Sequence, residues 1–431
     1  MRISIRQIII GLLGLLALST SSVNAQQDVV PTHPPVLPPP EALPDVNQTL
    51  EQDLYLEALQ AISEGRKGDA GALLARMVAR GARNAGEWLD LAMLQCALGH
   101  ANEAEQLFSA IESTLQPPKG LLAIIEDQRR QGCASWQPQQ QWGFAVARGY
   151  DQNVNQGASN SLYTIGDGSN GSLELAQDYL PKPDRYSAVT LDYASDLTQN
   201  GDLGYLQLFA RQNDSLSSYN TISFFAGLEH PWHWQRWRLR ASGMAGALTL
   251  GGQLYQAQSQ AQLRIVPPLA LPKTMELAIQ TGLTHLRYRT LSNFDSNTAE
   301  LRSTFTYRTD LQQIQTSAAV MRDHAVASRP GGDRSGWALG VTTRSVVTRG
   351  VEAELDWNLV HWNGKTAYSP GIIDTIRHQN THVLRAGLNI GLTTNSSLHL
   401  EWRQINNKEN ISIFQYDNHV FQASWRWRDG R

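Results

Sequence analysis

The sequence has little charge, little cysteine and no long apolar run beyond its start. Asp, Glu, Lys and Arg make up only 17% of the 431 residues, and the mean hydropathy is −0.35. No run of about 20 apolar residues follows the first 25 positions, which excludes a helical membrane protein. The 36 basic and 39 acidic residues give a net charge of −3, and nucleic-acid binding needs a concentrated basic face. We therefore expect no nucleic-acid partner.

Motifs for metal, nucleotide or catalytic chemistry are also missing. The chain has no His-Glu-x-x-His, no clustered Cys ligands and no phosphate loop. Its His residues are dispersed, so haem ligation is not expected. The adjacent Asp323 and His324 would be the natural acid–base pair, but neighbours in a strand point to opposite faces. We expect no catalytic site, no metal and no cofactor, and hence no enzyme.

The first 25 residues read as a secretory signal peptide. Met1, Arg2 and Arg6 precede an apolar stretch from Ile8 to Leu18, and small residues end at Ala25. The alternative, a single anchoring helix, would need a longer apolar core. Residues 26–48 follow as a proline-rich linker that is expected to be extended and disordered, since seven of the 18 prolines lie between Pro31 and Pro44.

Residues 49–135 show helical periodicity and an internal repeat. Four residue pairs are separated by 34 positions, which is the period of the tetratricopeptide repeat (TPR). A closing helix is expected near Leu121 to Arg130. An unrelated pair of helical hairpins is the alternative. The expected packing residues are Ala58, Gly65, Ala70, Leu74, Trp88, Ala92, Gly99, Ala104 and Phe108. We expect side chains such as Glu87, Asp90 and Gln95 to be exposed on the first helices, where substitutions of them would test a binding surface.

The only two cysteines, Cys96 and Cys133, lie in this helical region. An exported protein meets an oxidising compartment, so a disulfide between them is plausible. Spacing alone does not establish the bridge, because two cysteines pair only when their Cα atoms come within about 7 Å.

Residues 136–431 change to a period of two. Apolar residues alternate with polar ones in many segments, for example at Trp142-Phe144-Val146 and Val189-Leu191-Tyr193. Such strands suit either a soluble sandwich or the wall of a membrane barrel. Eleven of the 12 Trp lie here, commonly near strand ends. Six of them are expected to form aromatic girdles at the two membrane interfaces. These are Trp232, Trp234, Trp237, Trp357, Trp362 and Trp402.

Connection lengths favour the barrel. Short connections, as at Asn200-Gly201 and Arg349-Gly350, alternate with mostly longer ones, as at 151–184 and 365–379. Outer-membrane barrels have short periplasmic turns and long external loops. Thirteen connections imply about 14 antiparallel strands. The predicted fold is therefore α + β and multidomain: a short periplasmic helical TPR domain followed by a transmembrane β-barrel.

The first strand ends in Gly149-Tyr150-Asp151-Gln152-Asn153-Val154-Asn155. Two interpretations of Asp151, Asn153 and Asn155 are open. In one, their side chains cap exposed backbone groups where the strand enters a long loop. In the other, they face the lumen and line a path or gate.

The signal sequence, the short TPR region, this junction and a barrel of about 14 strands together resemble the surface lipoprotein assembly modifier (Slam) family. The resemblance implies an outer-membrane protein of Gram-negative bacteria that helps client proteins cross to the cell surface. Its implied partners are surface lipoproteins or small secreted proteins such as haem-binding ones, outer-membrane lipid and the barrel-assembly machinery. The chain departs from the usual barrel ending, because Arg428 to Arg431 follow the last aromatic residue, Trp427.

The expected function is recognition of clients in the periplasm and their delivery to the surface. The first alternative is a polysaccharide-export porin, which also joins helical repeats to a barrel. The second is a passive diffusion porin, for which the helical region has no obvious purpose.

Overall fold

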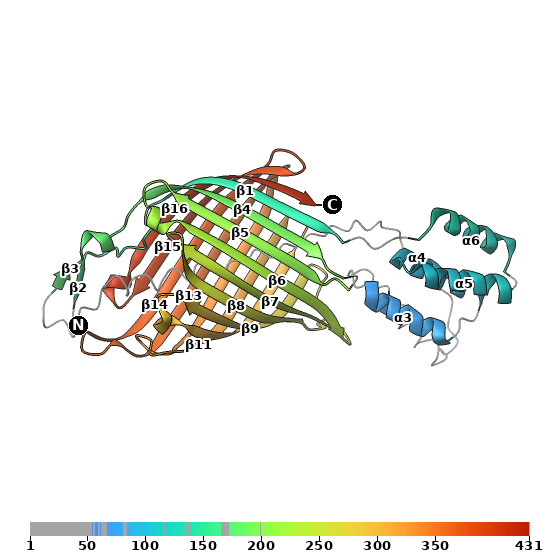
Figure 1. The fold of residues 1–431 in the computed structure, drawn as a ribbon, viewed down its shortest axis with the longest axis horizontal. Helices are drawn as coiled ribbons and strands as arrows, with labels where there is room; N and C mark the ends of the chain where they lie inside the picture. Colours follow the sequence, from blue (N-terminus) through green and yellow to red (C-terminus); the bar gives the residue numbers. More distant parts are fainter. Residues whose placement is uncertain are drawn as a thin grey trace. The chain divides into compact units, whose positions relative to one another are not determined.

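The computed structural model describes residues 54, 57–58, 61, 67–80, 84–115, 117–133, 138–164, 172–198 and 200–430. The expected signal peptide, the proline-rich linker and Gly65 lie outside these residues. The chain separates into two compact units, one helical and one built of strands. Figure 1 shows the elements of each.

The helical unit contains α3 (Lys67–Arg80), α4 (Ala85–Leu98), α5 (Ala101–Thr114) and α6 (Lys119–Gln131). Asn84 begins α4, because its side-chain oxygen accepts the Glu87 N–H at 3.0 Å. Gly99 ends α4 at φ 90°, a left-handed conformation that favours glycine. The expected turn between two helices is therefore present, and α4 packs on α5.

Small residues let the helices of this unit approach closely. Ala58, Ala70, Ala92 and Ala104 are fully buried. Leu74 and Phe108 fill the same core, and Trp88 packs against it from a half-buried position. These are the packing roles that the repeat pattern predicts, although the assignment to the TPR family stays a prediction.

The expectation that Gln95 is exposed on the surface of α4 is wrong. Gln95 is buried, and its side chain lies 2.7 Å from the His100 ring nitrogen at the turn. Glu87 and Asp90 are exposed, as expected. The turn after Leu98 brings His100 back over α4, which no helical periodicity shows.

Cys96 and Cys133 form a disulfide, with their Cα atoms 4.6 Å apart. Cys96 lies on α4, and Cys133 follows α6. The bridge ties the end of the closing helix to the core of the unit.

The second unit is a closed barrel of 14 antiparallel strands. Strands β1 and β16 close it, with a register that runs from Gln141↔Gly430 to Asp151↔Val420. A small ribbon, β2–β3, lies outside the ring. The strand bounds are β1 (Gln140–Asp151), β2 (Leu162–Thr164), β3 (Ser172–Glu174), β4 (Asp184–Asp196), β5 (Leu203–Asn213), β6 (Thr221–Trp234), β7 (Trp237–Leu250), β8 (Gln253–Val266), β9 (Met275–Tyr288), β10 (Ser296–Arg308), β11 (Gln312–Ala325), β12 (Arg334–Thr348), β13 (Val351–Ser369), β14 (Ile373–Gly391), β15 (Ser396–Glu409) and β16 (Tyr416–Gly430). The predicted order, a helical region followed by an antiparallel barrel, and the predicted strand number are confirmed.

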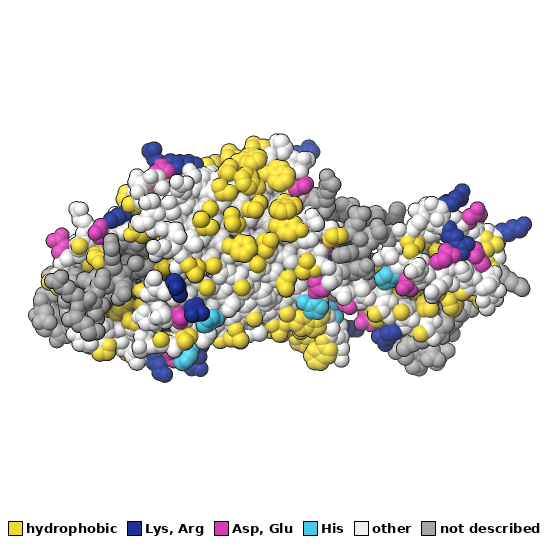
Figure 2. Space-filling model, viewed as in Figure 1, with side chains coloured by type: hydrophobic (Ala, Val, Ile, Leu, Met, Phe, Trp, Pro, Cys, Tyr) yellow, Lys and Arg dark blue, Asp and Glu magenta, His cyan; other side chains and the backbone are white. Residues whose placement is uncertain are grey.

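The outer wall of the barrel is apolar and the inner wall polar. Leu283, Val320 and Phe421 point outward and are more than half exposed. Figure 2 shows such apolar side chains across the visible wall. Outward apolar and inward polar residues alternate in outer-membrane barrels, and the barrel is of this type. Among the described residues, no helix combines the length and apolar character needed to cross a membrane.

Trp362 is an exception to the aromatic girdle expected from the sequence. It is buried, and the Arg334 guanidinium lies 4.8 Å from the centre of its ring. Its outward neighbour on β13 is His361, whose ring stacks on that of Trp337. The alternation of the strand therefore turns Trp362 toward the inside, where it packs with a cation rather than with lipid.

The two ends of the barrel differ. We call the end that carries both chain termini of the barrel the turn-side end, and the opposite end the loop-side end. Loop-side connections contain the short helices η2 (Gln177–Tyr179), η3 (Ser217–Tyr219), η4 (Ser292–Phe294) and η5 (Ser412–Phe414). The loop expected over 365–379 is wrong, because β13 and β14 continue as a long hairpin to a tight turn at Gly371, φ 82°.

Candidate functional site: the barrel lumen and its cap

Ion pairs line the lumen on strands β13 to β15. Arg385 Nε donates to Asp356 Oδ2 at 2.6 Å, and its Nη1 lies 3.6 Å from Glu401 Oε2. Arg403 Nη2 also donates to Glu401 at 2.9 Å. Alternate strand residues share a face, and cross-strand register places these groups side by side. This wall presents both signs of charge close together.

The opposite wall of the barrel lumen is different, because β8 carries a row of side-chain amides. Gln256, Gln258, Gln260 and Gln262 occupy alternate, inward positions. A hollow of about 60 Å³ lies beside this row and is lined by Gln260, Gln262, Gln280 and Arg302, among others. Gln256 Oε1 and Gln258 Nε2 are buried and form no hydrogen bond within the described residues. These amides are available to a solute that donates and accepts hydrogen bonds.

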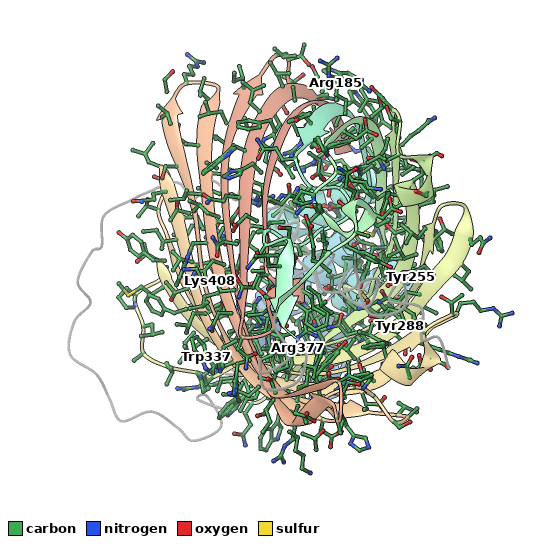
Figure 3. The ribbon with its side chains drawn as sticks, turned by 90° about the vertical axis from the view of Figure 1, so that its left-hand side faces the viewer. Arg185, Tyr255, Tyr288, Trp337, Arg377 and Lys408 are labelled. Carbon is green, nitrogen blue, oxygen red and sulfur yellow. A yellow bond between two sulfur atoms is a disulfide. The ribbon has the colours of Figure 1, made fainter. Side chains whose placement is uncertain are left out.

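A folded cap lies at the loop-side end. The connection between β1 and β4, which carries β2, β3 and η2, packs against η5 and the tip of the β13–β14 hairpin. Figure 3 looks into this end and shows the β2–β3 ribbon crossing the opening. The apolar centre of the cap consists of Ala158, Leu175, Tyr368, Ile411, Ile413 and Phe414. We call this set the cap cluster.

The junction motif of β1 folds the first part of the cap. Asp151 accepts the Asn153 N–H at 3.0 Å and an Nη2–H of Arg211 at 2.9 Å. The Asn153 side chain accepts the Gly157 N–H and donates to the carbonyls of Gly157 and Asp417. All the atoms involved lie within the cap or the strand ends around it.

Asn155, two residues after Asn153, also hydrogen-bonds backbone groups of the connection. Its amide donates to the Leu180 carbonyl at 2.8 Å, and its oxygen accepts the Lys182 N–H at 2.9 Å. Asp151, Asn153 and Asn155 are each less than a tenth exposed. The hydrogen bonds of all three are those that the first interpretation describes, and they hold both ends of the long connection together; the role in lining a path or gate stays a prediction.

A buried ion pair anchors the other side of the cap. Arg377 on β14 makes a bidentate contact with Glu409 on β15, both N–O distances being 2.6 Å. The Arg377 guanidinium lies 4.5 Å from the ring centre of Phe414, and Phe414 packs edge-on against Tyr368. Sequence reasoning missed these four residues. They are far apart in the chain, and only strand register and the hairpin's true length bring them together.

A second buried cluster fixes the connection between β11 and β12. Asp323 is fully buried and accepts hydrogen bonds from Arg329, Arg334 and Thr298. His324 is exposed and faces Asp333 instead. The two neighbours therefore point apart, as strand geometry requires. Among the described residues, no group of three or more His, Cys, Asp or Glu side chains could hold a metal ion.

No protein-family model matches the chain, and no curated protein matches it. Solved structures share the barrel fold at low similarity. Three of them cover 68% of this chain: an anion-selective porin from Comamonas acidovorans (10% identity, all of that chain, TM-score 0.36), Pseudomonas aeruginosa OpdK with vanillate (10%, 99%, 0.33) and a Pseudomonas aeruginosa FadL homologue (11%, 90%, 0.37). At these values the likeness identifies neither a family nor a solute. The resemblance to the Slam family stays a prediction.

Proposed function

We propose that this chain is an outer-membrane translocation factor. In this account the helical unit recognises client proteins in the periplasm, and the barrel aids their delivery to the cell surface. The observation that carries the proposal is the capped mouth. An apolar cluster and a buried ion pair pack the loop-side connections together, and in this account a client displaces that cap as it passes.

The proposed orientation rests on the even strand number together with the longer loops at one end. An even number of strands places both ends of the barrel on the same, periplasmic side. Strand β1 begins at the turn-side end, so the helical unit that precedes it belongs to the periplasm in this account. The loop-side cap then faces the outside of the cell.

The surface of α6 supports client recognition. Leu122 and Ile124 are exposed on this helix, at 39% and 47%. Their neighbour Ile125 is fully buried in the core. The two residues flank the buried face of α6 on different sides, because positions i and i+2 of a helix do not share a face. Each is proposed as a separate apolar contact for a client, since repeat arrays bind partners through their exposed surfaces.

The test is a double substitution, Leu122→Ser with Ile124→Ser, in a strain that carries a candidate client encoded beside this gene. We expect surface display of the client to fall several-fold while the barrel stays folded and heat-modifiable. Ala123→Ser, between the two on the same exposed stretch, is the matched control. Normal display in the double variant would reject α6 as the client surface.

Polysaccharide export is the second candidate, and the amide row of β8 favours it. Side-chain amides donate and accept hydrogen bonds without net charge, which suits a hydroxyl-rich polymer. Replacing Gln258 and Gln260 by Leu would reduce sugar export under this reading and leave client display unchanged.

A further inference from the structure

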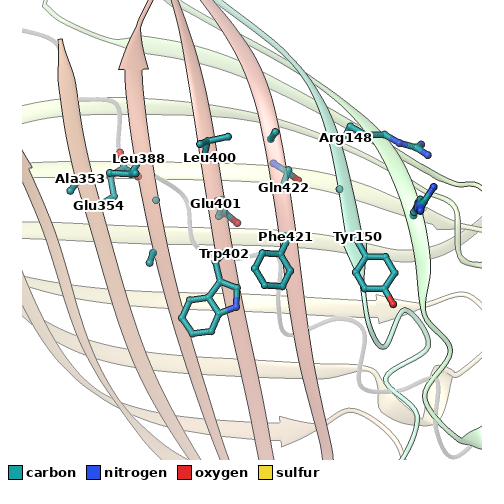
Figure 4. A pocket seen from close by; sticks show the side chains of 15 residues that line it. Arg148, Tyr150, Ala353, Glu354, Leu388, Leu400, Glu401, Trp402, Phe421 and Gln422 are labelled. Atoms are coloured by element: carbon teal, nitrogen blue, oxygen red, sulfur yellow. The ribbon is translucent and has the colours of Figure 1, made fainter.

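The outer wall of the barrel contains a groove of about 890 Å³ across β13, β14, β15, β16, β1 and β4. Figure 4 shows its lining. The volume lies in the range of small-molecule sites, about 300–1,000 Å³. A barrel exterior is convex, so a groove there must come from differences in side-chain size between neighbouring rows.

Strand register shows how the groove is built. One row of outward residues runs through Ala386, Trp402, Phe421, Tyr150 and Arg185, each paired with the next. The adjacent row runs through Ala353, Leu388, Leu400, Ala423 and Arg148 in the same way. Aromatic rings form one edge, and small alanines leave the space between them.

Both rows end in arginine at the loop-side ends of β1 and β4. Arg148 is ion-paired with Asp214 and donates to Ser187 at 3.0 Å. Arg185 is exposed at the rim, where Figure 3 labels it, and its guanidinium has no ion pair among the described residues. Asp214 also attracts Arg185, and the buried Asp184 acts on Arg148, so the charges of the four groups balance. Arg185 is the member of this set whose exposed guanidinium is left to donate hydrogen bonds at the end of an apolar groove.

We propose that this groove binds a lipid that carries a phosphate. An acyl chain would lie between the two rows against Phe421 and Leu400, and the phosphate would contact Arg185, with Arg148 behind it. Guanidinium groups bind phosphate through paired, charge-assisted hydrogen bonds. A phosphorylated lipid of the outer leaflet meets both demands, because the arginines lie at the loop-side end of the wall.

The charge separates this occupant from the acylated end of a lipoprotein client. A diacylglyceryl lipopeptide carries the same chains without a phosphate, so it satisfies the apolar groove and leaves Arg185 unpaired. The inference rests on the proposed outer-membrane orientation but not on client transport. Its test uses purified protein, so its failure is distinguishable from a failure of client display.

The experiment measures binding of bis-phosphorylated lipid A to the purified full-length chain in a non-ionic detergent, by native mass spectrometry across a lipid titration. Arg185→Gln should weaken binding by about tenfold or more, because it removes a charge-assisted contact. Ala423→Phe should weaken binding by blocking the groove. Arg322→Gln and Ala318→Phe, which face outward on β11 away from the groove, are the matched controls.

Two further lipids test which source of acyl chain the groove binds. The same glycolipid without phosphates and a synthetic diacylglyceryl lipopeptide should each bind weakly and show no response to Arg185→Gln. Equal affinity of the lipopeptide and the phosphorylated lipid would overturn the proposal. So would an Arg185→Gln variant that is heat-modifiable like the parent and binds lipid A unchanged.

Discussion

Asn153 shows how much structure one side chain can organise. It is almost fully buried, accepts one backbone N–H and donates to two carbonyls that are 260 residues apart in the chain. A buried backbone group left without a partner costs about 1–3 kcal/mol. This amide therefore contributes to the fold of the cap on the same scale as one of its buried apolar side chains.

We expect Asn153→Ala to loosen the connection between β1 and β4 by about 2–3 kcal/mol without unfolding the barrel. The measurement is the rate of protease cleavage within residues 156–180 in the folded, membrane-inserted protein. Gln152→Ala, the exposed neighbour, should leave that rate unchanged. Equal rates in both variants would show that the motif does not hold the cap.

Glu105 gives a pH-dependent prediction in the helical unit. Hydrogen bonds from Arg129 on α6 lower the pKa of this α5 carboxyl below its ordinary value of 4.5. A lowered pKa in the folded state adds stability above the unfolded pKa, and this stability is lost as the pH falls through the folded pKa. The α5–α6 contact should therefore weaken as the pH falls from about 6 to below 4.

The measurement is the protease sensitivity of the helical unit in the full chain across that pH range. Between neutral pH and the acid end of the range, the protease sensitivity of the parent protein should rise more than that of the Glu105→Gln variant. Parallel curves for the two proteins would contradict the role of the ion pair.

At the scale of elements, sequence patterns predict what each element does by itself. Alternation locates β1, β4, β5 and β7, and Gly251-Gly252 marks a tight turn whose φ values are both positive. The 34-residue spacing finds Ala92 and Phe108 in the core. These features depend on local periodicity, which a sequence displays directly.

The cap could not be predicted in this way. Arg377 and Glu409 meet only because β14 pairs with β15 in one register, and Tyr368 joins them because the β13–β14 hairpin is longer than its polar composition indicates. The inward position of Trp362 could not be predicted for the same reason. Whether it faces lipid or the lumen depends on where the alternation of the extended hairpin places it. The motif at Asp151 is visible in sequence, but its partners Gly157, Leu180 and Asp417 are not.

The anchor of the cap supplies a prediction about two elements at once. Arg377→Met should leave the buried Glu409 carboxylate uncompensated and destabilise the cap by about 3–5 kcal/mol. Combining it with Glu409→Gln should restore a substantial part of that loss, because both charges are then gone. Hydrogen exchange of residues 368–376 and 410–416 is the measurement. A double variant no more protected than the single one would reject the ion pair as the anchor.

The disulfide ties α4 to the end of α6 and makes a simple test. Alkylation of the folded protein without prior reduction should label neither Cys96 nor Cys133. Reduction before alkylation should label both. Complete labelling of the unreduced protein would show that the two thiols are free.

At the scale of the whole molecule, two units with separate cores share one chain. The barrel strands bond only to one another and close without an edge. Removal of residues 54–130 should therefore leave a barrel that is heat-modifiable on gels and resists extraction from outer membranes by salt. Recovery of the shortened protein in the soluble periplasmic fraction would contradict the independence of the barrel.

The central claim is that the helical unit selects clients for passage through a capped barrel. Its most direct test is the strain that lacks residues 54–130, in which surface display of the client and export of polysaccharide are measured together. The account predicts a folded barrel, lost client display and normal polysaccharide. Normal client display with lost polysaccharide would contradict it and favour the export porin instead.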